Sequence, residues 1–133
     1  YLHPDEEDYF VHGINFPVLK IGNSHLALAI CYEISVTQHA EDAFNQGAEI
    51  YVASVAKFKH GMEGATRRLA DIAKKYSSVV LMANCIGQSD GLTCAGSSAA
   101  WDKQGNIITQ LDENHEGIII LDTKTQKAIS RMM

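Results

Sequence analysis

The order of strand-like and helical segments in this sequence predicts an α/β fold. Apolar, strand-like runs alternate with helical patterns over the first two thirds of the chain, in the order 24–30, 35–45, 49–54, 64–76 and 78–84. Short strand-like runs without intervening helices follow, at 97–101, 106–111 and 117–121. Alternation of this kind predicts a layered α/β domain with right-handed crossovers, and the closing runs predict an antiparallel tail.

The N-terminal part of the chain predicts a β-hairpin. Strand-like runs at 16–21 and 24–30 are separated by Gly22 and Asn23, a dipeptide suited to a tight turn with positive backbone angles. The second run ends at Cys31, so the hairpin brings a thiol to the point where a strand leaves the core. A helix is expected next, with Ser35 or Thr37 as its N-cap and with its end at Gly47.

The remaining elements follow from periodicity. The 64–76 segment is amphipathic, with an apolar face that we interpret as core packing: Leu69, Ile72, Ala73 and Tyr76. The 78–84 run is apolar and β-branched, which is typical of a strand buried on both faces. A turn is expected at 102–105. The polar tail after Asp122 is expected to cross a neighbouring subunit or to fray.

Composition is that of an ordinary single domain. The chain has 133 residues, of which 46% are hydrophobic and 20% charged. Its net charge of -5 is spread along the chain without a basic patch, so nucleic acid and anionic membranes are rejected as partners. No apolar stretch approaches the roughly 20 residues that cross a bilayer, and no charged-then-apolar leader opens the chain. These features predict a cytoplasmic protein.

The cysteines and histidines predict neither a disulfide framework nor a metal site. Cys31, Cys85 and Cys94 are an odd set without a close pair, which suits a reducing compartment. The six histidines are scattered, and the zinc patterns His-Glu-x-x-His and Cys-x-x-Cys are absent from the sequence. Glycine motifs for nucleotide phosphates are absent too. No cofactor is therefore expected.

Cys31 is the most informative candidate residue. Free cysteines are often buried and behave as small hydrophobic residues, so a structural role is the simple alternative. A functional role is favoured by a series of landmarks that occur in a fixed order along the chain. They are Glu6 within the acidic and aromatic segment 5–13, then Cys31 itself, then the segments 47–52, 82–87, 95–98 and 101–105.

This series resembles the carbon-nitrogen hydrolase family, also called the nitrilase superfamily, from about Tyr1 to about Leu121. The nucleophile of the family lies in a Cys-aromatic-acid triplet at the end of an apolar strand, matched here by Cys31, Tyr32 and Glu33.

The family also places a glutamate shortly before a Phe and a Gly. Glu6, with Phe10 and Gly13, fits this spacing. Glu7, the next residue along the chain, is the alternative for the same position. An acidic cluster of this kind is otherwise usually a solvated loop.

The resemblance implies an α-β-β-α sandwich in which two sheets face each other. It also implies a catalytic lysine immediately before Tyr1 and a general-base glutamate further upstream. Residues 1–133 are therefore expected to be the C-terminal portion of a carbon-nitrogen hydrolase domain, inactive alone. Members of the family commonly dimerise, so a homodimer or higher homo-oligomer is expected.

The chemistry implied by the resemblance is hydrolysis of a small amide or nitrile through a Cys31 thioester. Glu6 would orient the lysine and the substrate, and the backbone N–H of Tyr32 would donate to the oxyanion. By family position Ser54 and Ala56 would line the pocket, although Ser-Val-Ala-Lys-Phe at 54–58 departs from the common Asn-Pro-Ala type and leaves the substrate open. An amidase or ω-amidase is favoured, with a nitrilase or a carbamoyl-amine hydrolase as sister possibilities.

Two functions of other classes remain open at this point. One is a non-catalytic domain of the same fold that serves binding or subunit assembly, and the other is a redox-responsive thiol protein. Some matched residues are interpreted as structural: Glu33 as a possible ion-pair or hydrogen-bond partner, Asn84 as an amide that satisfies backbone groups, and Gly87 as a tight turn.

Overall fold

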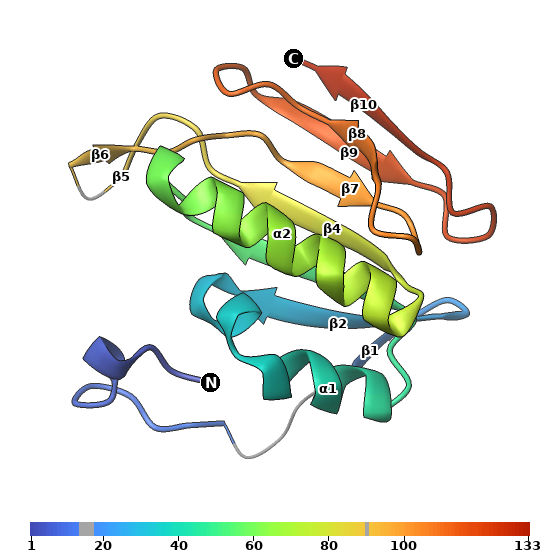
Figure 1. Ribbon diagram of the computed structural model, residues 1–133, viewed down its shortest axis with the longest axis horizontal. Helices are drawn as coiled ribbons and strands as arrows, with labels where there is room; N and C mark the ends of the chain where they lie inside the picture. The colour runs from blue at the N-terminus through green and yellow to red at the C-terminus, as the bar shows by residue number, and fades with distance from the viewer. Residues whose placement is uncertain (14–17, 90) are drawn as a thin grey trace.

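The protein has a six-stranded mixed sheet with both α-helices on one face (Figure 1). The computed structural model describes residues 1–13, 18–89 and 91–133. The sheet has the order β1-β2-β3-β4-β7-β8, and β2, β3 and β4 are parallel. Its strands are β1 (Val18–Ile21), β2 (Ser24–Ile30), β3 (Ile50–Val55), β4 (Val79–Asn84), β7 (Ala99–Trp101) and β8 (Ile107–Gln110). The predicted α/β class is confirmed.

The N-terminal hairpin is confirmed. Strands β1 and β2 pair antiparallel, with Ile21 opposite Ser24, and Gly22 has φ +61°. Phe16 and Pro17, which the predicted first strand included, lie outside the described residues.

The helix after the hairpin begins differently from the prediction. A 3₁₀ turn, η2 (Cys31–Ser35), comes first, and α1 (Thr37–Asn45) follows. Val36 is the N-cap residue and makes no side-chain cap, so neither Ser35 nor Thr37 fills this role. The Ser35 hydroxyl instead accepts a hydrogen bond from Arg68 at 3.0 Å. Gly47, with φ +88°, follows the end of the helix as predicted.

Helix α2 (Lys59–Tyr76) begins five residues earlier than the sequence predicts. Two glycines in its first turns, Gly61 and Gly64, lower the helix propensity and obscure this start in the sequence. Packing against the core overrides that preference, because Met62 contacts the core cluster and Ala65 is buried.

The core lies between the helices and one face of the sheet. Its inward side chains alternate along the central strands and include Ala27, Ala29, Tyr51, Ala53, Val80 and Met82. On the opposite face Leu28 and Ile30 are 47% and 70% exposed. Strand β4 was predicted to be buried on both faces, and this is wrong at Ala83, which is exposed because no described element covers that end of the second face.

The C-terminal tail ends in a strand, so the expectation that it frays is wrong, and its contact with a neighbouring subunit stays a prediction. Strands β9 (Gly117–Leu121) and β10 (Ala128–Met132) pair antiparallel beside β8 (Figure 1). The Thr109 hydroxyl of β8 donates to Ser130 of β10 at 2.8 Å. Asp122 accepts hydrogen bonds from two turn N–H groups, so the chain reverses where the sequence becomes polar.

A short hairpin and a disulfide were not predicted. Strands β5 (Gln88–Ser89) and β6 (Leu92–Thr93) pair antiparallel, and Cys85 forms a disulfide with Cys94. The expectation that no cysteines pair is therefore wrong, since the hairpin reverses the chain and brings the two Cα atoms within 5.7 Å.

Asn84 satisfies backbone groups, as predicted. Its side-chain oxygen accepts from the Lys57 N–H at 2.7 Å, and its amide donates to the carbonyls of Lys57 and Gly96. Gly87 has φ +77° at the start of the hairpin. Neither helix in the part of the chain described here is long and apolar enough to cross a membrane.

Candidate active site

Cys31 lies where β2 ends and η2 begins. Its φ of +41° is in the left-handed region, which costs a non-glycine residue roughly 1 to 2 kcal/mol. Such backbone strain persists only where surrounding contacts enforce it. The thiol is half-buried, and it is the one free cysteine among the described residues.

A cavity of about 1110 Å³ opens in front of this turn. Its lining includes Cys31, Tyr32 and Glu6, so the structure brings together three of the predicted site residues. Apolar side chains on the uncovered face of the sheet, among them Leu28 and Ile30, form another part of the wall.

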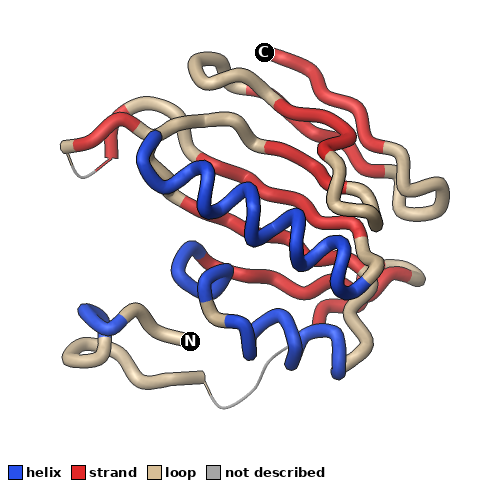
Figure 2. The backbone as a smooth tube through the Cα atoms, in the orientation of Figure 1, coloured by secondary structure: helices blue, strands red, loops and turns tan. Residues whose placement is uncertain are grey.

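Glu6 reaches this cavity from the N-terminal segment, which is loop except for one helical turn (Figure 2). That turn is η1 (Pro4–Glu6), and the Glu6 carboxylate accepts the His3 N–H at 2.8 Å. The His3 ring packs edge-on against the Tyr32 ring with 4.9 Å between centroids. This ring contact holds the segment that carries Glu6 beside the residue that follows Cys31.

Ser54 and Ala56, which were predicted to line the pocket, lie near the end of β3. Ser54 pairs with Ile30 across β2 and β3 and is exposed, so it lies one residue from the strand end that carries the thiol. Ala56 follows the last residue of β3 and is exposed as well. Neither is among the described residues that line the cavity, and their role stays a prediction.

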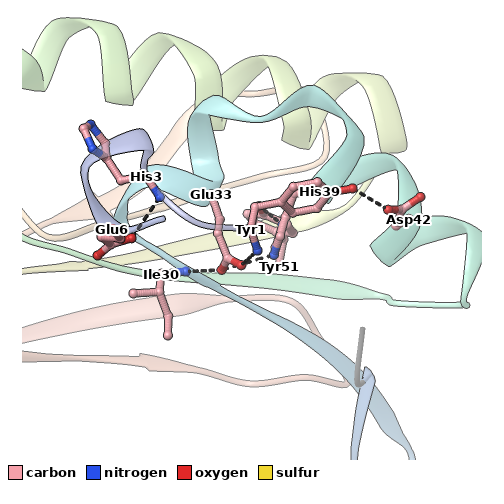
Figure 3. Close-up of polar contacts among 8 residues, drawn as sticks. All are labelled: Tyr1, His3, Glu6, Ile30, Glu33, His39, Asp42 and Tyr51. Atoms are coloured by element: carbon pink, nitrogen blue, oxygen red, sulfur yellow. Dashed lines mark hydrogen bonds and ion pairs between the residues drawn. The ribbon is translucent and has the colours of Figure 1, made fainter. Parts of the chain in front are cut away.

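Sequence reasoning missed a polar cluster that joins α1, β3 and η2 (Figure 3). Its members are His39 of α1, Tyr51 of β3 and Glu33 of η2, and His39 Nδ1 lies 2.8 Å from the Tyr51 hydroxyl. Burial lowers the pKa of His39, opposed by the nearby Glu33 carboxylate, and burial also raises the pKa of Tyr51. A usable signal was present, since His39 falls on the same helical face as the buried Ala40 and Ala43.

No group of three or more possible metal-ligating side chains occurs within 1–13, 18–89 and 91–133. The chemistry that these residues offer is that of a thiol with neighbouring carboxylates.

The sequence profile of carbon-nitrogen hydrolases matches residues 2–130. The chain belongs to the carbon-nitrogen hydrolase family. This confirms the resemblance carried by the Cys31 triplet and by the order of the other landmarks.

Curated relatives of this chain include a synthetase and an amidase. A glutamine-dependent NAD(+) synthetase of Thermotoga maritima is 30% identical over 122 residues, which cover 89% of this chain and 21% of that protein. An (R)-stereoselective amidase of a Pseudomonas species is 27% identical over 135 residues, which cover 98% of this chain and 48% of that protein. The chain thus spans less than half the length of each.

The fold is that of solved amidases of the nitrilase superfamily. A structure of a mutant of the amidase from Nesterenkonia sp. AN1 is 25% identical, with a TM-score of 0.71, and the match covers 85% of this chain and 43% of that chain. In that structure the acetamide moiety of fluoroacetamide is covalently added at the active-site cysteine. This chain has a mixed α/β fold that corresponds to part of such amidases.

Proposed function

We propose that this chain carries the nucleophile-bearing portion of an amidase that hydrolyses small linear amides or ω-amides. The observation that supports this most is the free Cys31 thiol at a left-handed turn, facing a cavity that Glu6 also lines. The similarity to amidases supports an amide substrate.

In the proposed reaction the Cys31 sulfur attacks the amide carbon after a general base removes the thiol proton. The carbon-nitrogen bond breaks, and ammonia or an amine leaves with a proton, giving a thioester. Water then attacks the thioester, the acid product leaves, and the thiol is restored. The Tyr32 N–H is proposed to donate to the oxyanion, and one such donor contributes roughly 3 kcal/mol of transition-state stabilisation.

The other residues have supporting roles in this proposal. Glu6 orients the substrate and the family lysine, which we expect on the segment preceding Tyr1. Ser54 and Ala56 are proposed to contact the substrate, since Ser54 pairs with the residue before the nucleophile. Residues 1–133 act as part of one larger carbon-nitrogen hydrolase domain, and the whole protein is proposed to form a homodimer or higher homo-oligomer.

The cytoplasmic location stays a prediction. The Cys85–Cys94 disulfide counts against a strongly reducing compartment, where such bonds are rare. Cell fractionation, with thiol trapping of these two cysteines, tests both points together.

Replacement of the nucleophile tests the proposal. In the intact natural protein Cys31→Ala should abolish hydrolysis of small primary amides while the circular dichroism spectrum is retained. A wild-type sample quenched during turnover should carry the acyl mass on the peptide that contains Cys31. Full activity of Cys31→Ala would refute the mechanism.

The non-catalytic alternative has its own discriminating measurement. The exposed apolar side chains Leu28 and Ile30 are the observation that favours an assembly role. If the intact mass of the natural protein matches 14.6 kDa, the family lysine and base are missing and this alternative takes precedence.

A further inference from the structure

The turn that carries Cys31 is closed by one carboxylate. Glu33 Oε2 accepts a hydrogen bond from the backbone N–H of Ile30 at 2.8 Å, and the Glu33 carbonyl accepts from the Val36 N–H at 3.0 Å. Ile30 and Glu33 lie on either side of Cys31 in the sequence, so the bond between them encloses the cysteine in a small ring. The position of the thiol therefore depends on where the Glu33 carboxylate is held.

A buried histidine holds that carboxylate (Figure 3). His39 Nε2 lies 3.3 Å from Glu33 Oε2, and His39 Nδ1 lies 2.8 Å from the Tyr51 hydroxyl. The exposed fractions of His39 and Tyr51 are 1% and 0%. The other carboxylate oxygen, Glu33 Oε1, accepts from the backbone nitrogen of Tyr1 at 2.8 Å.

The protons in this cluster follow from its chemistry. A carboxylate can only accept, so the His39 tautomer that suits Glu33 carries its proton on Nε2. Because burial lowers the pKa of His39 and raises that of Tyr51, we assign a neutral ring whose Nδ1 accepts from the tyrosine hydroxyl. One neutral imidazole thus links the core strand β3 to the Glu33 carboxylate.

Resting on the proposed function, we propose that His39 is a positioning residue of the reaction, which fixes the Glu33 carboxylate and through it the backbone and thiol direction of Cys31. The left-handed φ of Cys31 makes this support necessary, because an unsupported non-glycine residue relaxes toward negative φ. A displacement of about 1 Å at a reacting atom can reduce a rate by about 100-fold.

Two amide variants of His39 separate its two contacts. The amide of His39→Asn is short and reaches the place of Nδ1, so it keeps a partner for Tyr51 and leaves Glu33 without one. The longer amide of His39→Gln reaches the place of Nε2 and can donate to Glu33. A matched control is Ser78→Ala, which removes a buried hydroxyl that bonds Glu49 at the far end of the parallel strands.

The readouts are the rate of Cys31 alkylation by iodoacetamide, followed by peptide mass spectrometry, and kcat and KM for a small amide. In the intact natural protein His39→Asn should slow alkylation and lower kcat at least 10-fold with KM changed less than threefold. His39→Gln should recover most of both rates. Ser78→Ala should lower the melting temperature and leave both rates within twofold of the wild type.

Equal alkylation rates in His39→Asn and the wild type would overturn the inference, as would no recovery in His39→Gln. If His39→Asn does not fold, Tyr51→Phe decides the matter, because it keeps the ring in the core and removes only the bond to Nδ1. It should slow alkylation by a smaller factor, and a rate equal to that of the wild type would overturn the inference.

Alkylation does not require amide turnover, so the two proposals fail separately. A wild-type protein that is alkylated at Cys31 but hydrolyses no amide would remove the proposed function. The comparison of His39 variants would still decide whether His39 positions the thiol.

Discussion

Replacement of Asn84 by alanine should destabilise the fold by about 3 kcal/mol. The Asn84 side chain makes three hydrogen bonds to backbone groups, two with Lys57 and one with Gly96. Each bond contributes about 1 kcal/mol net, and their sum gives the expected loss. The cost can exceed this sum, because the partly buried Lys57 and Gly96 groups would be left without this partner.

Urea denaturation of the wild type and Asn84→Ala at neutral pH measures this difference. The midpoint should fall while the slope m stays constant, and the melting temperature should fall by roughly 10 °C. Asn84→Asp keeps the acceptor for the Lys57 N–H but turns a carboxylate oxygen toward the carbonyls of Lys57 and Gly96, so it should be at least as destabilising as Asn84→Ala.

Gln88→Ala is the matched control, because Gln88 makes one exposed hydrogen bond to Thr93 in the adjacent hairpin. It should change stability by less than about 0.5 kcal/mol. We reason that the Asn84 amide joins the loop after β3 to the segment after β6. If Asn84→Ala lost no more stability than Gln88→Ala, this reasoning would be refuted.

Three further predictions concern backbone angles and one carboxylate. Cys31→Gly should be more stable than Cys31→Ala by about 1 kcal/mol in urea denaturation, because glycine adopts the φ of +41° without strain; an equal or lower stability would contradict the strain. Gly96→Ala should lower the free energy of unfolding by roughly 2 to 4 kcal/mol in the same measurement, because φ is +54° and the added Cβ would lie 2.9 Å from backbone atoms of Asp112 and Glu113. An unchanged stability would mean that this contact relaxes easily. Hydrogen bonds from the Asn114 N–H and from His115 lower the pKa of Asp112 to about 2. The folded-state pKa is depressed, so this stabilisation is present above pH 4 and is lost as the pH falls toward 2. The melting temperatures of the wild type and Asp112→Asn should therefore differ at neutral pH and converge near pH 2, and a difference independent of pH would exclude this cause.

The alternating core of the fold could be predicted from the sequence because its signals are local. Strand β2 and strand β9 have the predicted bounds, since apolar runs flanked by Gly22 and Gly117 mark them clearly. The early start of α2 could not be predicted, because Gly61 and Gly64 disfavour a helix until the core contacts of Met62 are known.

The candidate site was predictable only in part. The Cys31 triplet is a contiguous motif that can be recognised without coordinates. The role of His39 depends on its contact with Tyr51, 12 residues away on another element, which a sequence alone does not specify. The Cys85–Cys94 disulfide was missed for a similar reason, since a two-residue strand pair creates it.

That disulfide has a consequence for proteolysis. The β5–β6 hairpin lies outside the main sheet, and Leu92 is 50% exposed, so it is the kind of loop that proteases cleave first. A single cut between Cys85 and Cys94 would leave two polypeptides joined by sulfur. On a gel without reductant the nicked protein would run as one band, and only reduction would separate the fragment that carries Cys31 from the one that carries Trp101.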